Sequence, residues 1–147
     1  MGKRINFTVL GTPVGKARPR ITRFGAYTPE KTIVAEDTIR REYAASCDNV
    51  KFDAERPLRM KVDAYFPIPQ SASAKKKADM TSNAVRPTKK PDWDNLGKLV
   101  SDALNQVAYY DDKQIVDCTV RKFYSDKPRL EIEIDEIMER RRLLLTD

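Results

Sequence analysis

The sequence predicts one α+β domain, in which a mixed sheet of about four strands packs against two helices on one face. Apolar residues alternate with polar ones in several segments, which is typical of half-buried strands. In two other segments they recur every three or four residues, which is typical of amphipathic helices. A chain of 147 residues suits a single compact core. The sequence contains no internal repeat and no sign of a second domain. We therefore expect residues 1–147 to form one domain.

The N-terminal part predicts a strand, a loop and a helix. Alternation over residues 4–10 predicts the strand. The loop that follows holds, at residues 25–27, the return of a short hairpin. Thr28 as N-cap and Pro29 as the first helical residue then begin a helix over residues 29–45. The side chains that this helix is predicted to bury are Ile33, Val34, Ile39 and Tyr43.

The middle of the chain holds the clearest strand and the longest loop. Residues 58–66 alternate between apolar and polar side chains. Residues 67–90 are predicted as a long basic loop, because prolines end the strand and flank the next helix. A loop of this length inside a compact domain is usually functional or mobile. The sequence leaves open a short helix over residues 73–79 within it.

The central helix follows Pro91. Its apolar residues form one face at spacings of three and four: Leu96, Leu99, Val100, Ala103, Leu104 and Val107. We expect Asp92 at the N-cap and Asp94 in the first turn. On the opposite face, Asp94, Lys98 and Asp102 follow one another at spacings of four residues.

The last third predicts two neighbouring strands. The acidic pair Asp111–Asp112 precedes a strand that begins at Ile115. Turn-forming residues 125–128 separate it from an alternating segment over residues 130–135, so we expect these two strands to pair as a hairpin. Residues 136–147 are expected to form a C-terminal tail or a short helix, whose arginines at 140–142 either touch DNA or are solvated.

The two acidic pairs indicate a divalent-metal site. Asp92 and Asp94 precede the central helix and the second pair follows it, so the pairs converge if the helix packs on the next strand. The chain contains no histidine. Oxygen ligands therefore remain, and carboxylate-rich sites suit Mg²⁺ or Mn²⁺. The alternative is structural, because acidic residues in a first turn also favour the helix dipole.

The basic charge indicates a phosphate-bearing polymer as partner. The formal net charge is +6 and the pI is near 9.3. Basic residues gather in two stretches of the sequence: Lys16, Arg18, Arg20, Arg23, Lys75, Lys76, Lys77, Arg86, Lys89 and Lys90. For each stretch, contact with DNA phosphates and a role in solubility alone are both open.

The cysteines and the hydropathy of the chain indicate the cellular compartment in which we expect the protein. Cys47 and Cys118 show neither a metal-binding spacing nor a disulfide framework, and we expect both to be buried. No apolar run approaches the ~20 residues that span a bilayer, and the N-terminus lacks the apolar core of a signal peptide. We therefore expect an intracellular, cytoplasmic protein.

The central motif also resembles a known family. The run PDWDNLGKLVSDAL at 91–104, followed by YYDDKQIVD at 109–117, resembles the core of the RusA-type Holliday junction resolvases. These are DNA endonucleases common in bacteria and their prophages. GKARPR at 15–20 and YTPEKT at 27–32 resemble the N-terminal part of a prophage-type branch. The likeness extends from about Ile5 to about Asp135.

The resemblance implies an active site of three aspartates and a lysine. These match Asp92, Asp94, Asp112 and Lys98, with the aspartates as ligands of Mg²⁺ or Mn²⁺. Asn95 matches a further residue of the motif and is expected to position a ligand or a backbone phosphate. The length of the loop before the second acidic pair varies among relatives, so Asp111 stays the alternative to Asp112. Trp93 either stacks on an unpaired base or pins the start of the helix to the core.

The resemblance further implies a homodimer, encoded by a bacterium or a phage, that acts in DNA recombination and repair. Its expected substrate is a four-way junction, cut by metal-assisted hydrolysis of a phosphodiester bond. Lys98 is expected to stabilise charge on the phosphate in the transition state. Two alternatives are a branched-DNA-binding protein without catalysis and a nuclease that acts mainly on flaps or forks.

Overall fold

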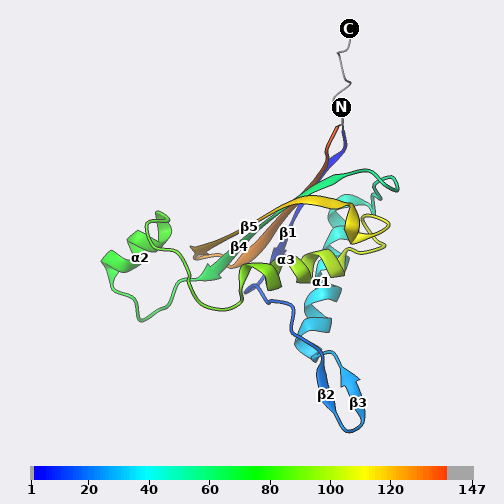
Figure 1. Cartoon of the computed structure of the whole chain (residues 1–147). Coiled ribbons are helices and arrows are strands. Elements are labelled where there is room, and N and C mark those ends of the chain that lie inside the picture. The colour runs from blue at the N-terminus through cyan, green and yellow to red at the C-terminus, as the bar shows by residue number, and fades with distance from the viewer. Residues whose placement is uncertain (1, 139–147) are drawn as a thin grey trace.

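The computed structural model describes residues 2–138. Its centre is a mixed four-stranded sheet in the order β1-β6-β4-β5, in which β4 and β5 are parallel and the other neighbours antiparallel. The strands are β1 (Arg4–Leu10), β4 (Leu58–Pro67), β5 (Ile115–Ser125) and β6 (Arg129–Glu136). Helices α1 (Glu30–Cys47) and α3 (Trp93–Ala103) pack against each other and cover one face of the sheet (Figure 1). The predicted α+β class is confirmed.

The apolar stripe of α3 anchors it in the core, as its periodicity predicts. Its buried residues Leu96, Leu99, Val100 and Ala103 are each at most 1% exposed. They pack with inward side chains of β1, β4 and β6: Ile5, Phe7, Val9, Met60, Val62, Leu130, Ile132 and Ile134. Burial of each leucine contributes about 1.5–3 kcal/mol. The position of α3 over the sheet is therefore determined by packing.

Helix α1 differs from the prediction in its start and in its buried face. The N-cap is Pro29 rather than Thr28, and the helix begins at Glu30. Ile33 and Val34 are 50% and 56% exposed, so their predicted burial is wrong. The stripe that faces β1 and α3 consists of Thr32, Ile39, Tyr43 and Cys47. Successive helical residues are about 100° apart, so the two apolar residues after Thr32 turn away from the sheet.

The predicted hairpin of β5 and β6 is wrong, because β4 lies between these strands. β5 pairs with β4 in parallel, and β6 pairs with β4 and β1 in antiparallel register. The connection over residues 126–128 therefore crosses the end of β4. Two interstrand spacings amount to about 9.5 Å, which a few extended residues span. Turn chemistry marks the reversal of the chain but does not identify which strands become neighbours.

The two cysteines have different environments. Cys47, the last residue of α1, is buried, as predicted, whereas Cys118 is exposed. The difference arises because β5 is an edge strand of the sheet. Gly97 brings α3 close to β5 at Val120, where a Cβ on the glycine would lie 3.3 Å from Val120 Cγ2. Cys118, nearer the start of the strand, stays open to solvent.

Two smaller elements project from this body (Figure 1). β2 (Arg20–Thr22) and β3 (Gly25–Tyr27) form the predicted short hairpin. α2 (Ala74–Thr81) occupies the middle of the predicted 67–90 loop, so that loop is not continuous and the short helix left open by the sequence is present. Ser73 caps it, with its Oγ accepting a hydrogen bond from the Lys76 N–H at 3.2 Å. α2 contacts β5.

The C-terminal prediction is only partly covered by the structure. Glu136 ends β6, and residues 137 and 138 have no regular secondary structure. Residues 139–147, including the arginines at 140–142, lie outside the described residues. Within the described part of the chain, no helix is long and apolar enough to cross a membrane.

Candidate active site

The start of α3 presents Asp92 and Asp94 to solvent. Asp92 has the extended backbone of an N-cap, but its side chain makes no capping hydrogen bond. Asp94 lies in the first turn and is exposed. Because neither carboxylate is needed to complete the helix through a side-chain cap, helix capping does not account for this pair. Both carboxylates are available to a ligand.

In the second acidic pair, one carboxylate caps a short helix and the other does not. A short 3-10 helix, η1 (Asp112–Gln114), follows Asp111, whose Oδ1 accepts a hydrogen bond from the Lys113 N–H at 2.9 Å. The Gln114 side chain completes a capping box by accepting from the Asp111 N–H at 3.2 Å. Asp111 is thus engaged in the cap, which favours Asp112 as the functional residue.

Gln114 fixes this loop to the body of the protein. It is buried, and its Nε2 donates to the carbonyl oxygens of Asp53 at 2.9 Å and Arg56 at 3.1 Å. This anchor is a functional feature that was not predicted from the sequence. The signal was present, because an Asp followed three residues later by Gln is a capping-box pattern.

Asp94, Lys98 and Asp112 line one hollow between α3 and β5, with a volume of about 290 Å³. The helix and the η1 loop thus bring together three of the four predicted catalytic residues. Burial raises the pKa of Asp112, the adjacent Asp111 raises it further, and Lys98 lowers it. The carboxylate of Asp112 is therefore one that a nearby cation stabilises.

The fourth predicted residue, Asp92, faces a neighbouring groove of about 690 Å³, which Asp94 and Asn95 also line. Asp94 therefore stands at the boundary between the hollow and the groove. The groove carries five basic side chains: Lys16, Arg18, Lys31, Lys89 and Lys90. Four of them were predicted to bind DNA, and Lys31 was not identified from the sequence.

The other predicted DNA-binding residues lie elsewhere. Arg20 and Arg23 belong to the β2–β3 hairpin, which continues from the loop that lines the groove. Lys75, Lys76 and Lys77 lie on α2 and are exposed. They form a separate basic surface, and Arg86 is bound to the sheet by donating its Nε–H to the Lys122 carbonyl oxygen at 2.8 Å.

Lys16 is held by two carboxylates. Its Nζ lies 2.8 Å from Glu36 Oε2 and 3.3 Å from Asp102 Oδ2. Burial lowers the pKa of Lys16, but these two partners outweigh it and the net shift is upward, so the ammonium group stays charged. Asp102 also binds Lys98, whose Nζ is 3.1 Å from its Oδ1. One carboxylate therefore orients the lysines of the groove and of the hollow.

The loop before the hairpin is closely attached to the start of α3. The Lys16 N–H donates to the Asn95 carbonyl oxygen at 2.8 Å. A Cβ at Gly15 would lie 2.6 Å from Pro91 Cβ and 3.2 Å from Asn95 Cβ, so a larger residue does not fit without a shift. The wall of the groove is thus defined by backbone packing.

The donor chemistry of these residues fits a divalent cation, since all candidate ligands are carboxylate oxygens. Asp94 and Asp112 share the hollow, while Asp92 opens on the groove beside it. In residues 2–138, no three His, Cys, Asp or Glu side chains are gathered closely enough to form a complete metal site. The aspartates therefore offer ligands from two neighbouring cavities rather than a closed cluster.

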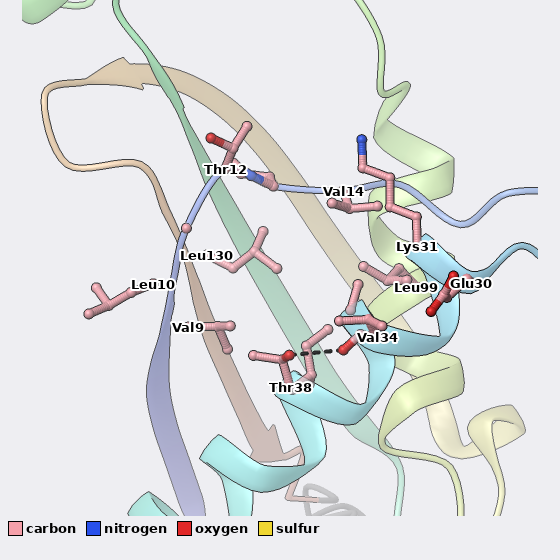
Figure 2. Close-up of a pocket in the computed structure, with 14 residues that line it drawn as sticks. Val9, Leu10, Thr12, Val14, Glu30, Lys31, Val34, Thr38, Leu99 and Leu130 are labelled. Carbon is pink, nitrogen blue, oxygen red and sulfur yellow. Dashed lines mark hydrogen bonds between the residues drawn. The ribbon is translucent and has the colours of Figure 1, made fainter.

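An apolar pocket of about 480 Å³ lies apart from these carboxylates, between β1 and the first half of α1 (Figure 2). Val9, Val34, Leu99 and Leu130 line it together with Thr38, whose Oγ1–H donates to the Val34 carbonyl oxygen of the preceding turn at 2.8 Å. Its charged residues are Glu30 and Lys31 alone. This composition suits apolar packing and not hydrolysis.

Comparison with known proteins agrees with the sequence motif. The family model described as endodeoxyribonuclease RusA matches residues 11–135. The chain is 40% identical over 142 residues to the uncharacterized protein YqaN of Bacillus subtilis (strain 168), covering 90% of this chain and 96% of that protein. It is 36% identical over 87 residues to the crossover junction endodeoxyribonuclease rusA of Lactococcus phage r1t, covering 58% and 60% of the two chains. The chain belongs to the RusA endodeoxyribonuclease family.

Proposed function

We propose that the protein is a Mg²⁺-dependent endodeoxyribonuclease that resolves Holliday junctions by hydrolysing phosphodiester bonds. The observation that supports this proposal most strongly is that Asp94 lines two neighbouring cavities. On one side lies a hollow with Asp112 and Lys98, and on the other a basic groove with Asp92. Carboxylates that can bind a metal ion lie beside a positively charged groove. This arrangement suits a DNA backbone that passes over both.

The three aspartates have the role of holding the cation. Mg²⁺, when bound, activates water for attack on phosphorus and offsets negative charge on the phosphate. Asp92, Asp94 and Asp112 supply the oxygen ligands, with Mn²⁺ as an alternative cation. Asp94 is central, because it can reach a ligand in either cavity.

Lys98 has the role of an electrostatic stabiliser. It lies one turn after Asp94 and shares the hollow with Asp112. Its Nζ also lies 3.1 Å from Oδ1 of Asp102, one turn further along α3. A cation held in this position stabilises the charge that develops on the phosphate during the reaction.

The basic groove binds the DNA backbone away from the reacting bond. Arg18, Lys89 and Lys90 supply the cations, and Asn95 can hydrogen-bond a phosphate oxygen or orient a neighbouring ligand. Because Lys16 is paired with two carboxylates, its main role here is to tie the loop to α1 and α3.

A homodimer would match the two-fold symmetry of a four-way junction with two equivalent active sites. Two exposed apolar surfaces support such an association. The β2–β3 hairpin exposes Ile21 and Phe24 at 86% and 87%, and the apolar pocket beside α1 is lined in part by the exposed side chains of Leu10 and Val34. Light scattering of the wild type and of Phe24→Asp tests this. A wild type that stays monomeric at micromolar concentration, with and without junction DNA, contradicts the dimer.

A cleavage assay tests the proposed function. A synthetic four-way junction, a flap and a linear duplex of equal length are incubated with the protein in Mg²⁺ and in EDTA. We expect paired cuts near the crossover of the junction in Mg²⁺ alone. Binding without cutting in Mg²⁺ or Mn²⁺ would indicate a branched-DNA-binding protein, and faster cutting of the flap would move the function to that substrate.

A further inference from the structure

The hollow beside the carboxylates has an apolar half that phosphate chemistry does not use. Asp94, Lys98 and Asp112 account for its charged rim. Apart from Ser101, the rest of its lining is apolar: Met60, Trp93, Gly97, Ile115, Cys118 and Val120. A site for a phosphate and a cation alone needs no such surface. Its composition, largely apolar with three charged groups, is that of a site for a flat organic group.

Trp93 is the largest apolar group of this hollow, and it is exposed. The side chain is 67% exposed, although α3 carries an apolar stripe that is fully buried. It therefore does not pin the helix start to the core, which was one of the two roles expected from the sequence. An exposed tryptophan gives up the stabilisation that burial would contribute. This position is better explained by a ligand than by folding.

Two aromatic rings on the sheet are covered by arginines. Arg86 lies over the Phe123 ring at 4.2 Å, and Arg129 lies over the Tyr65 ring at 3.9 Å. Phe123 and Tyr65 also stack on each other, with centroids 5.1 Å apart. Within residues 2–138, Trp93 takes part in no such ring–ring or cation–π contact. Its ring is free to stack on a ligand.

We propose that Trp93 and the apolar half of the hollow receive one unstacked DNA base next to the phosphate that is cut. This inference rests on the proposed function and names a subsite of the same site. The three charged residues on the rim of the hollow suit the sugar–phosphate backbone, while the ring and the apolar wall suit the base. Stacking on an aromatic ring accepts any base, because every base has a π-face.

The subsite favours branched DNA over linear duplex. A base can reach the Trp93 ring only after it leaves its helical stack, and this costs least where the base is unpaired or next to a branch. The subsite therefore contributes to affinity for a junction and contributes little for an intact duplex. A protein segment is a less suitable occupant, since it would have to cover Asp94, Lys98 and Asp112 without compensating their charges.

The single tryptophan of the chain makes the proposal directly measurable. Excitation at the red edge of the tryptophan absorption band, where the six tyrosines absorb little, makes the fluorescence of the full-length protein report on Trp93 alone. We titrate it in EDTA with a four-way junction and with a linear duplex of the same length, while a mobility-shift assay measures binding independently. We expect the junction to quench the emission and the duplex to leave it nearly unchanged. Bound junction with unchanged emission would overturn the proposal.

Substitutions at Trp93 separate stacking from apolar packing. Trp93→Phe keeps an aromatic face and should bind the junction within about threefold of wild type. Trp93→Leu is apolar but cannot stack, and should lose roughly tenfold or more in junction affinity with little change for duplex. Tyr110→Ala, which removes another exposed aromatic side chain that does not line the hollow, is the control and should bind normally. Equal junction affinity for the Phe and Leu variants would overturn the stacking role.

The two readouts distinguish this proposal from the proposed function. If the junction quenches Trp93 but is not cut in Mg²⁺, the nuclease function fails and the base subsite stands. If the junction is cut while Trp93→Leu binds and cuts as wild type, the subsite fails and the nuclease stands. Thermal unfolding of the three variants shows whether any loss follows the folded fraction, and the fluorescence titration of the wild type provides the test if the Leu variant unfolds.

Discussion

The start of α3 and the β2–β3 hairpin differ in how packing holds them. α3 buries four apolar residues between the sheet and α1, so the exposed aspartates at its start are carried by a rigid element. All six strand residues of the hairpin are exposed, and its strands pair only with each other. Precise geometry is needed where bonds are broken, whereas a phosphate chain tolerates cations on a mobile element. The protein thus places its carboxylates on the core and many of its cations on projections.

The largest expected effect comes from the rigid region. Asp92→Asn, Asp94→Asn and Asp112→Asn each keep the side-chain size but remove a charge from the proposed metal site. We expect each to lower the rate of junction cleavage by orders of magnitude, because the metal activates the water. Junction binding in EDTA should persist or tighten, since a negative charge near the phosphates is removed. Single-turnover cleavage and mobility shift measure the two effects.

Asp111→Asn is the matched control. It removes the same charge one residue away, at a carboxylate engaged in the capping box. Asn is also a good N-cap, so the loop should survive and cleavage should stay near the wild-type rate. A loss at Asp111 as large as that at Asp112 would contradict the division of this pair into structural and functional carboxylates.

The next largest effect is expected at Lys98. Lys98→Ala removes the cation that Asp102 holds at the hollow, and should slow cleavage by roughly 10²–10³-fold. The apparent Mg²⁺ affinity, measured by titration of the cleavage rate, should change little because the ligands remain. Lys113→Ala removes a lysine next to Asp112 that does not line the hollow, and should have a small effect. A large change in Mg²⁺ affinity for Lys98→Ala would assign the lysine to the metal site instead of the phosphate.

The sequence predicts the rigid region well, because local patterns determine much of it. The period of α3 identifies its buried face, and the alternation of β1, β4 and β6 identifies theirs. Pro91 and the acidic pair identify the start of the helix. These features depend on residues close in sequence, so periodicity and capping rules apply directly. The two acidic pairs could be located for the same reason, whereas the selection of Asp92, Asp94, Asp112 and Lys98 as catalytic residues comes from the family resemblance and stays a prediction.

What the sequence did not predict depends on interactions between distant segments. Turn chemistry at residues 125–128 could not show that β4 lies between β5 and β6, because strand order is decided by the whole sheet. The exposure of Cys118 follows from that order. Asp63 alternates like a solvent-facing residue but is buried, paired with Arg121 through two hydrogen bonds of 2.7 Å. The ion pair between Lys16 and Asp102 likewise could not be predicted, because it depends on the path that the loop takes over α3.

The next largest difference is expected in how substitutions in α3 and in the β2–β3 hairpin change the free energy of unfolding. Leu99→Ala removes a side chain that is 1% exposed and should lower the free energy of unfolding by about 2–5 kcal/mol. Phe24→Ala removes a larger side chain at the tip of the hairpin, yet should change it by no more than about 0.5 kcal/mol at low protein concentration. Urea unfolding followed by circular dichroism measures both. Comparable losses would show that the hairpin is packed in solution, and the contrast between the regions would then fail.

The smallest effect on the cleavage rate is expected from substitutions in α2, the second element that projects from the body of the protein. Lys75, Lys76 and Lys77 are exposed, and in the described part of the chain none of them is within an ion pair. If they bind phosphates, replacing all three with Gln should weaken junction binding and flatten its salt dependence, by about one unit of slope for each phosphate that the variant no longer neutralises. The cleavage rate at saturating junction should not change, because α2 does not line either cavity at Asp94.

A triple Gln variant at Lys3, Lys51 and Lys61 is the control for this prediction. It removes the same charge from other parts of the surface, and so tests whether net charge alone weakens binding. We expect its salt dependence to stay closer to that of the wild type than to that of the α2 variant, because phosphates are neutralised one by one at the surface they touch. Equal slopes for the α2 variant and the wild type would assign the lysines of α2 to solubility, and the binding surface would then end at the groove and the hairpin.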